Sequence, residues 1–203
     1  MCRSRGRPHA YEAVDPSQTA LVVVDVDTAS AARQPELVAD AVENINRLGD
    51  ALRLGGGAVA YVLSTIGDPN GLGLRLGTDV AKVYVAETQP GEPGAVLYNG
   101  LSVHASDVQV HKSGASAFFP GKCDLHGVLQ ARGVSSILIA GLVTNICCES
   151  SARDAHELGY EVTMISDANV GQSYGLHEAT LATFFRYFGD VRTTADAIQL
   201  VDP

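Results

Sequence analysis

The sequence lacks the features by which several protein classes are recognised. Its four cysteines, among 203 residues, have a spacing that fits neither a zinc site nor a disulfide framework. It has no apolar run near the roughly 18 residues that a membrane span needs. It also has no stripe of basic residues, and its 14 Lys and Arg against 23 Asp and Glu give a net charge of −9. We therefore expect no metal site, no membrane segment and no nucleic-acid partner.

The first ten residues contain arginines but no apolar segment behind them, which is not the pattern of a secretory signal. We therefore expect a cytoplasmic protein. The hydrophobic fraction of 46% and the charged fraction of 18% are typical of a globular chain. The length predicts a single domain over 1–203 that buries a full core, preceded by a loose leader at 1–18.

Apolar runs alternate with stretches of helical periodicity along the whole chain. The runs predict strands at 20–26, 58–64, 108–111, 137–140, 161–166 and 191–193. The periodic stretches predict helices at 35–54, 124–132, 147–158, 176–188 and 194–200. This alternation predicts an α/β fold, a three-layer α/β/α Rossmann-like domain with a mainly parallel central sheet of about six strands.

One segment does not fit the alternation. Residues 66–107 are rich in Gly and Pro and show little periodicity. A loop this long inside a compact domain is usually a lid, a substrate loop or an interface element. We therefore expect a variable lid or loop there.

Three chemically complementary residues follow predicted strands: Asp25, Lys112 and Cys147. Ligands of parallel α/β sheets bind outside the carboxyl ends of the strands, so all three are candidates for one site. Each also has a plainer interpretation. Asp25 suits a turn or helix cap, Lys112 an exposed lysine, and Cys147 a small buried filler.

Together the three residues could perform acyl transfer. An ammonium at Lys112 would favour the thiolate of Cys147 and keep Asp25 ionised. Asp25 could take the thiol proton and return it to a leaving amine. Backbone N–H groups of the turn at 143–147 could hold the oxyanion of a tetrahedral intermediate.

Three stretches of the sequence resemble the isochorismatase-like (cysteine hydrolase) family: ALVVVDVD at 20–27, VQVHKSGASAF at 108–118 and GLVTNICCESSARDAHELGYEVTMISDA at 141–168. The resemblance implies that Asp25, Lys112 and Cys147 form a catalytic triad and that no cofactor takes part. It also implies a non-proline cis peptide before Thr144, between Val143 and Thr144. That peptide would shape an oxyanion hole with the N–H groups of Thr144 and Cys147.

The sequence departs from the family pattern at a few positions. Asp27 replaces a Gln, and its carboxylate could either raise the pKa of Asp25 or contact a cationic substrate. Cys148 replaces a Val and is interpreted as packing. The Asp-x-His metal motif of nicotinamidases is absent, since 64–68 reads Ser-Thr-Ile-Gly-Asp. The cysteine that isochorismate-hydrolysing members commonly lack is present, which favours amide or ureide substrates.

The sequence therefore predicts a C–N hydrolase of a small amide, carbamoyl or ureido compound. Two alternatives stay open: a vinyl ether hydrolase with Asp25 as general acid, and a non-catalytic binding module. We expect substrate contacts from 66–107 and from Asp27, Ser116, Phe118, Phe119 and Tyr174. The family, together with the aromatic helix at 176–188, predicts a homo-oligomer, a dimer or tetramer.

Overall fold

The computed structural model describes residues 8–65 and 69–201. Residues 1–7 of the predicted leader and 66–68 of the predicted lid lie outside this range. The rest of the leader lies against the sheet edge, where Val162 N donates to Tyr11 Oη at 3.3 Å and Arg192 donates to Tyr11 O. No helix among the described residues is long and apolar enough to cross a membrane.

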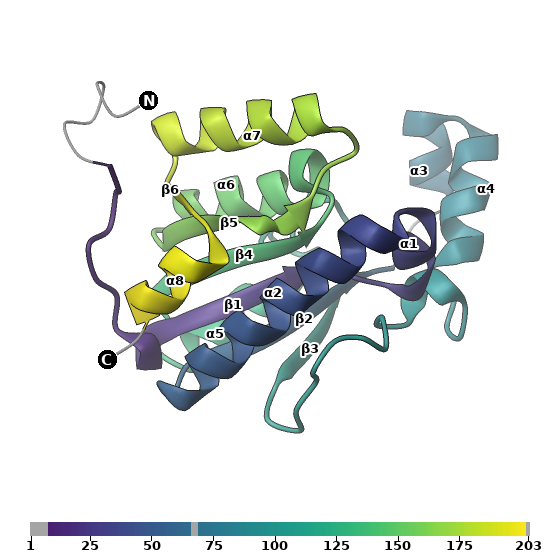
Figure 1. Ribbon diagram of the computed structural model, residues 1–203. Helices are drawn as coiled ribbons and strands as arrows, with labels where there is room; N and C mark the ends of the chain where they lie inside the picture. Colours follow the sequence, from purple (N-terminus) through teal and green to yellow (C-terminus); the bar gives the residue numbers. More distant parts are fainter. Residues whose placement is uncertain (1–7, 66–68, 202–203) are drawn as a thin grey trace.

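The described chain forms a six-stranded sheet in which every neighbouring pair is parallel (Figure 1). The strands are β1 (Thr19–Val24), β2 (Ala58–Ser64), β3 (Val108–Lys112), β4 (Ser136–Leu142), β5 (Glu161–Val170) and β6 (Asp190–Arg192). Their order is β3-β2-β1-β4-β5-β6. The chain first adds β2 and β3 on one side of β1, and after a reversal between β1 and β4 it adds the later strands on the other side. The predicted fold class is confirmed, and the reversal marks where such sheets open a crevice for ligands.

Helices cover both faces of the sheet (Figure 1). On one face α2 (Pro35–Leu54) and α8 (Thr194–Val201) pack against Leu21 and Val23 of β1. On the other face α5 (Leu125–Gln130), α6 (Glu149–Glu157) and α7 (Tyr174–Tyr187) pack against Val22 and Val24. Because β1 is buried on both faces, all its residues are apolar except Thr19, and each fully buried Leu or Val contributes about 1.5–3 kcal/mol.

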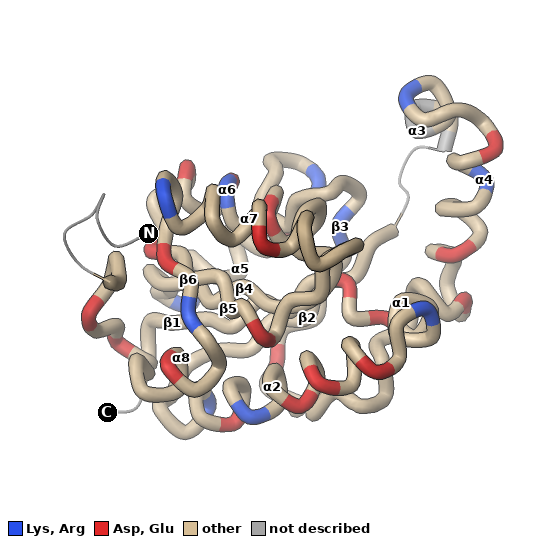
Figure 2. The backbone as a smooth tube through the Cα atoms, turned by 45° about the horizontal axis from the view of Figure 1, so that its top comes forward, with Lys and Arg blue, Asp and Glu red and all other residues tan. Residues whose placement is uncertain are grey.

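The segment expected to be a long loop contains two helices, α3 (Pro69–Leu76) and α4 (Thr78–Glu87), and a 3₁₀ turn at Pro93–Ala95. In Figure 2 these helices project as a hairpin beyond the body of the domain. Only Ala81 of α4 is buried, while Val80 and Val83 are exposed. Without a buried face the hairpin has no clear apolar periodicity, which is why the sequence predicted a loop.

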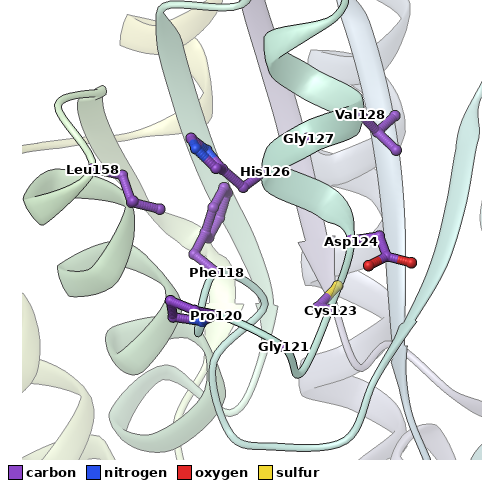
Figure 3. Close-up of a pocket in the computed structure, with 9 residues that line it drawn as sticks. All are labelled: Phe118, Pro120, Gly121, Cys123, Asp124, His126, Gly127, Val128 and Leu158. Atoms are coloured by element: carbon purple, nitrogen blue, oxygen red, sulfur yellow. The ribbon is translucent and has the colours of Figure 1, made fainter.

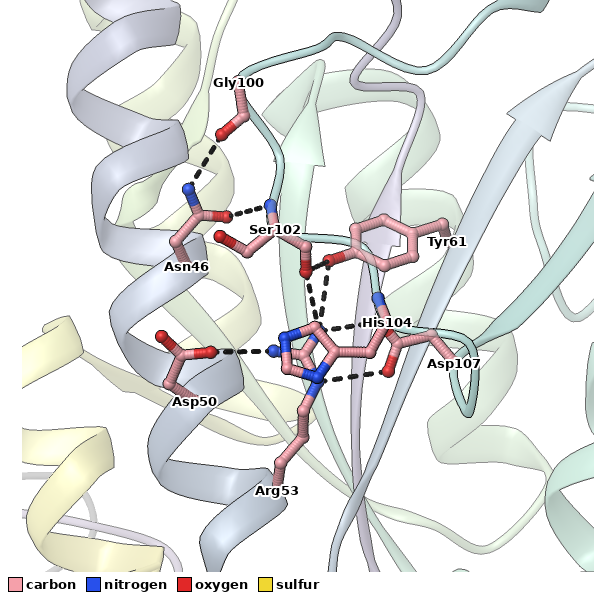
Figure 4. Close-up of polar contacts among 8 residues, drawn as sticks. All are labelled: Asn46, Asp50, Arg53, Tyr61, Gly100, Ser102, His104 and Asp107. Carbon is pink, nitrogen blue, oxygen red and sulfur yellow. Dashed lines mark hydrogen bonds and ion pairs between the residues drawn. The ribbon is translucent and has the colours of Figure 1, made fainter.

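The chain between the hairpin and β3 is fixed by a network around Arg53 of α2 (Figure 4). Arg53 donates to both carboxylate oxygens of Asp107, at 3.1 and 2.7 Å, and to Ser102 O at 2.9 Å. Tyr61 Oη of β2 donates to the same carbonyl at 3.0 Å, and Asn46 binds Ser102 N and Gly100 O. The network therefore fixes where β3, which ends at Lys112, enters the sheet.

Candidate active site

Four neighbouring strands contribute one polar residue each at their carboxyl ends. Lys112 is the last residue of β3, Ser64 the last of β2, Asp25 follows β1, and Cys147 lies in the turn after β4. The four residues lie along this edge in the same order as their strands lie in the sheet. Lys112 and Ser64 are register partners on the neighbouring strands β3 and β2, and β1 lies between β2 and β4. The topology thus brings together residues up to 122 positions apart (147 minus 25).

Lys112 is the most buried member, with 1% of its surface exposed. Its Nζ lies 2.7 Å from Asp25 Oδ2, 2.6 Å from Ser64 Oγ, 3.1 Å from Gly114 O and 3.5 Å from Cys147 Sγ. Burial alone would lower the pKa of this ammonium, but the charge of Asp25 and the hydrogen bonds that Lys112 makes to Asp25 and Cys147 outweigh it, and the pKa lies above its usual value. Lys112 is therefore charged at neutral pH, and its partners compensate for its burial.

Asp25 has a left-handed backbone, with φ of 51°, where β1 ends. Aspartate tolerates this conformation better than most residues do. Its backbone N–H donates to Val62 O at 2.8 Å, and its Oδ1 accepts from Ser64 Oγ at 2.9 Å. With Lys112 on Oδ2, both carboxylate oxygens have partners, so the side chain is held in one orientation.

Ser64 is a member of the site that the sequence did not predict. Its hydroxyl accepts from Lys112 Nζ and donates to Asp25 Oδ1, so it bridges the two ions. The available signal was its place as the last residue of β2, level with Lys112 on the neighbouring strand. A hydroxyl next to a strand-end ion pair is a candidate for orienting it.

Cys147 lies in a single π-helical turn, Thr144–Cys148, from which α6 continues. Its thiol is half-buried. Burial and the negative charge of Asp25 together raise the pKa of the Cys147 thiol to about 12, against the opposing effect of Lys112. Lys112 favours the thiolate, as the sequence predicts, but burial and Asp25 outweigh it, so the resting group is a neutral thiol beside a base.

A non-proline cis peptide is present, but one residue earlier than expected. It joins Leu142, the last residue of β4, to Val143, instead of joining Val143 to Thr144. Val143 is extended (φ −98°, ψ 145°), and the helical turn starts at Thr144. Only Val143 therefore separates the end of β4 from the helical turn. Val143 O accepts from the N–H groups of Ile146 (3.0 Å) and Cys148 (3.3 Å).

Two contacts hold this turn against the start of α7. Thr144 Oγ1 and His177 Nδ1 are 2.9 Å apart. Asn145 and Gln172 exchange two hydrogen bonds, from Asn145 Nδ2 to Gln172 Oε1 at 2.9 Å and from Gln172 N to Asn145 Oδ1 at 3.1 Å. Burial lowers the pKa of His177, so its ring is neutral at neutral pH.

A cavity of about 460 Å³ opens in front of the thiol. Its inner wall holds Asp25, Ser64, Lys112 and Cys147. Its outer wall comes from α1 (Thr28–Arg33), the ends of α3 and α4, and Gly94. Residues between Arg75 and Gly94 of the predicted lid segment thus line this cavity, mostly from helices. No group of three or more His, Cys, Asp or Glu among the described residues is placed to hold a metal ion.

Asp27 lines the cavity but is already engaged. Its two carboxylate oxygens accept from Ser30 N and Ser30 Oγ, both at 2.8 Å, so it caps α1. Burial raises the pKa of Asp27, and the nearby charge of Asp25 adds to this. A helix cap thus occupies the position where the family pattern has Gln.

The other predicted substrate contacts lie outside this cavity. Phe118 is 2% exposed and packs against Tyr160, and it lines a separate pocket of about 400 Å³ that also holds Cys123 (Figure 3). Ser116 and Phe119 line a neighbouring groove. Tyr174 is exposed near the start of α7, in a different pocket. Cys148 is fully buried in the core, in agreement with a packing role.

Comparison with known proteins gives a consistent result. The model of the isochorismatase domain matches residues 19–196. An uncharacterized isochorismatase family protein, YwoC, from Bacillus subtilis is 31% identical over 194 residues, which cover 93% of this chain and 96% of that protein. The ureidoacrylate amidohydrolase RutB of Caulobacter segnis is 29% identical over 207 residues, which cover 90% and 85%.

A solved structure adds to the match in three dimensions. The crystal structure of a cysteine hydrolase from Pseudomonas syringae pv. phaseolicola superposes with a TM-score of 0.84 and 29% identity. The superposition covers 96% of this chain and 97% of that one.

Proposed function

Because the chain belongs to the isochorismatase family, we propose that it is a cysteine hydrolase that cleaves the C–N bond of a small amide, carbamoyl or ureido compound. The observation that carries the proposal is the convergence of an acid, an ammonium and a thiol on one cavity, with Lys112 Nζ 2.7 Å from Asp25 and 3.5 Å from Cys147. The amidohydrolase name of RutB, a relative over most of the chain, supports the same bond type.

In the first half-reaction, Cys147 Sγ attacks the carbonyl carbon while Asp25 takes the thiol proton. The neutral resting thiol makes this base necessary, because too little thiolate forms without it. Asp25 then gives the proton to the amine nitrogen, the C–N bond breaks, and an acyl thioester remains on Cys147. In the second half-reaction, water attacks the thioester with Asp25 again as base, which releases the acid and restores the thiol.

The oxyanion of each tetrahedral intermediate needs donors close to Cys147. The N–H groups of Ile146 and Cys148 already donate to Val143 O. We assign the oxyanion hole to the N–H groups of Thr144 and Cys147, at the start of the turn where a helix leaves its N–H groups without internal partners. Lys112 offsets the charge on Asp25, and Ser64 orients that carboxylate.

The test is hydrolysis of a panel of amides and ureides, followed by ammonia release and by mass spectrometry of the intact protein. Cys147→Ala is expected to lower turnover by at least about 10³-fold and to abolish the acyl adduct. Cys123→Ser is the matched control, because Cys123 is also a free cysteine but lies in the separate pocket of Figure 3. It should leave turnover unchanged.

Two outcomes would contradict the proposal. Turnover of isochorismate that survives Cys147→Ala would mean ether hydrolysis with Asp25 as the acid. An acyl adduct on Cys123 instead of Cys147 would place the nucleophile elsewhere.

We also propose that the protein is a single-domain homo-oligomer. Large apolar side chains are exposed on α7, with Tyr187 at 65% and Leu176 at 47%, and on the α3–α4 hairpin, with Leu74 at 91%. A mass of 21.2 kDa in light scattering, that of one chain, would contradict this.

A further inference from the structure

One side chain of the active-site cavity has hydrogen-bonding capacity that the protein does not use. Gln172 lies between β5 and α7 and lines the cavity in front of Cys147. The other described residues from β4 onward that line this cavity are Leu142, Val143 and Ile146, which are apolar. On this part of the wall Gln172 is therefore the one polar side chain besides the thiol.

The hydrogen bonds to Asn145 fix which end of the Gln172 amide is free. Gln172 N is a backbone donor and donates to Asn145 Oδ1 at 3.1 Å, so the other end of the Asn145 amide is its donor, Nδ2. That Nδ2 donates to Gln172 Oε1 at 2.9 Å, so the oxygen of Gln172 is engaged. Gln172 Nε2 keeps two N–H donors and makes no hydrogen bond with any described residue.

The same two bonds hold the Gln172 amide in place. Asn145 belongs to the π-helical turn, Thr144–Cys148, that carries Cys147. Because the backbone N–H and the side-chain oxygen of Gln172 are both tied to Asn145, the amide keeps one orientation relative to that turn. A donor that is ordered before binding costs a ligand less entropy than a mobile one.

The charges of the cavity favour a neutral partner for this donor. Three acids and three bases line the cavity: Asp25, Asp27 and Glu87, and Arg33, Arg75 and Lys112. Lys112 pairs with Asp25 and Arg33 with Glu87, while Asp27 accepts from Ser30. The cavity therefore has no excess of one charge, and the Gln172 amide adds none.

We propose, on the basis of the function proposed above, that Gln172 is a specificity-determining residue whose Nε2 donates a hydrogen bond to a neutral oxygen of the substrate. The substrate class is then an amide or ureide with a second oxygen acceptor, a carbonyl or ether oxygen, apart from the reacting carbonyl. A substrate that lacks this oxygen displaces water from Nε2 without replacing the hydrogen bond, so Gln172 discriminates against it.

The test compares 3-methoxypropanamide with pentanamide, in which a CH₂ group replaces the ether oxygen. Initial rates of ammonia release give kcat/KM for each amide in the wild type, Gln172→Glu, Gln172→Ala and Gln130→Ala. Gln172→Glu is the sharpest variant, because its carboxylate can still accept from Asn145 Nδ2 but has no N–H to donate. Gln130 is the matched control, because it is an exposed glutamine at the end of α5 and does not line the cavity.

The deciding quantity is the ratio of kcat/KM for the ether amide to kcat/KM for pentanamide. It should fall about fivefold in Gln172→Glu and in Gln172→Ala, as expected for the loss of one neutral hydrogen bond, and stay unchanged in Gln130→Ala. An effect of either variant on the turn, or of the added charge on the thiol, changes both amides alike and cancels in the ratio. An equal ratio in the wild type and Gln172→Glu would overturn the inference, because Gln172 would then only hold the turn.

A binding measurement separates this inference from the proposed function. Calorimetry of both amides with the Cys147→Ala protein, with and without Gln172→Glu, involves no hydrolysis. Binding of 3-methoxypropanamide that Gln172→Glu weakens, with pentanamide unaffected, supports the inference even if neither amide is hydrolysed. Ether amide that fails to bind, or binds equally to both proteins, overturns the inference even if amides are hydrolysed.

Discussion

Replacing Asp25 by asparagine is expected to change the reactivity of Cys147 and the hydrolytic activity in opposite directions. In the wild type, burial and the Asp25 charge hold the pKa of the thiol at about 12. Asparagine removes that negative charge and leaves Lys112, which acts in the other direction. The thiol pKa therefore falls while the base is lost.

The magnitude follows from the thiolate fraction. At pH 8 a thiol with pKa of about 12 is about 1 part in 10⁴ ionised, against about one quarter for an ordinary cysteine with pKa of about 8.5. A thiolate of higher pKa is intrinsically more nucleophilic, which recovers part of this difference. Cys147 should react about 50- to 100-fold more slowly than an unstructured cysteine. Each pKa unit that Asp25→Asn removes should speed alkylation about threefold.

The assay is alkylation by iodoacetamide between pH 7 and 10, with the modified residue identified by peptide mapping. In the wild type the Cys147 rate should rise tenfold per pH unit without a plateau, because the whole range lies below the pKa. In Asp25→Asn the rate at pH 8 should be higher, while amide hydrolysis falls by at least about 10²-fold. A wild-type plateau below pH 9, or slower alkylation in Asp25→Asn, would refute the reasoning.

Three further substitutions test the surrounding structure. Lys112→Met leaves Asp25 buried without its counterion, so the free energy of unfolding in urea should fall by about 3–5 kcal/mol; an unchanged free energy of unfolding would contradict this. Ser64→Ala removes one hydrogen bond to each ion and should cost about 1–3 kcal/mol and lower kcat with little change in KM; unchanged kcat would contradict the bridging role. Arg53→Met leaves Asp107 without its counterion and should speed proteolysis of the chain before β3, as followed by mass spectrometry; an unchanged cleavage pattern would contradict it.

The fold was predictable because the central strands β1, β2 and β4 are mainly runs of apolar residues. Helix α2 was predicted with its observed ends, since Pro35 suits a first helical position and Gly55 follows its last turn. The α3–α4 hairpin was not predicted. It projects from the domain with most of its apolar residues exposed, so its sequence carries no sign of which side faces the core.

The ions of the site were predictable for a related reason. A charged residue that ends a buried strand, or directly follows one, must lie at the edge of the sheet where that strand ends. The carboxyl ends of parallel strands lie at the same edge, so such residues come together. Ser64 was missed because a serine at a strand end needs no partner, so its residue type gives no signal; its position level with Lys112 becomes a signal only once β2 and β3 are known to pair. The pKa of Cys147 was not predictable, since it depends on how burial, Asp25 and Lys112 balance, and only coordinates give that balance.

The role of Gly141 in the structure differs from the one that the sequence indicated. The glycine suggests a break after the apolar run 137–140, yet β4 continues to Leu142. Gly141 has φ of +119°, and a Cβ there would lie 2.1 Å from Val24 O and 2.7 Å from Val24 N. Glycine is therefore required at this position because β1 and β4 approach closely there. Asp25 directly follows this point on β1, and Cys147 lies in the turn that follows β4.

Gly141→Ala is therefore expected to separate the two strands where the acid and the thiol meet. Gly159→Ala is the matched control, because Gly159 also has a positive φ, of +92°, but a Cβ there meets nothing within 4 Å. The control should lose only the conformational cost of about 1–2 kcal/mol in urea unfolding and keep its turnover. Gly141→Ala should lose more stability than this, and the protein that still folds should show lower kcat, because contact between Asp25 and Cys147 depends on the spacing of these strands. If both variants lost the same stability and Gly141→Ala kept full turnover, the close approach of β1 and β4 would not be what positions the site.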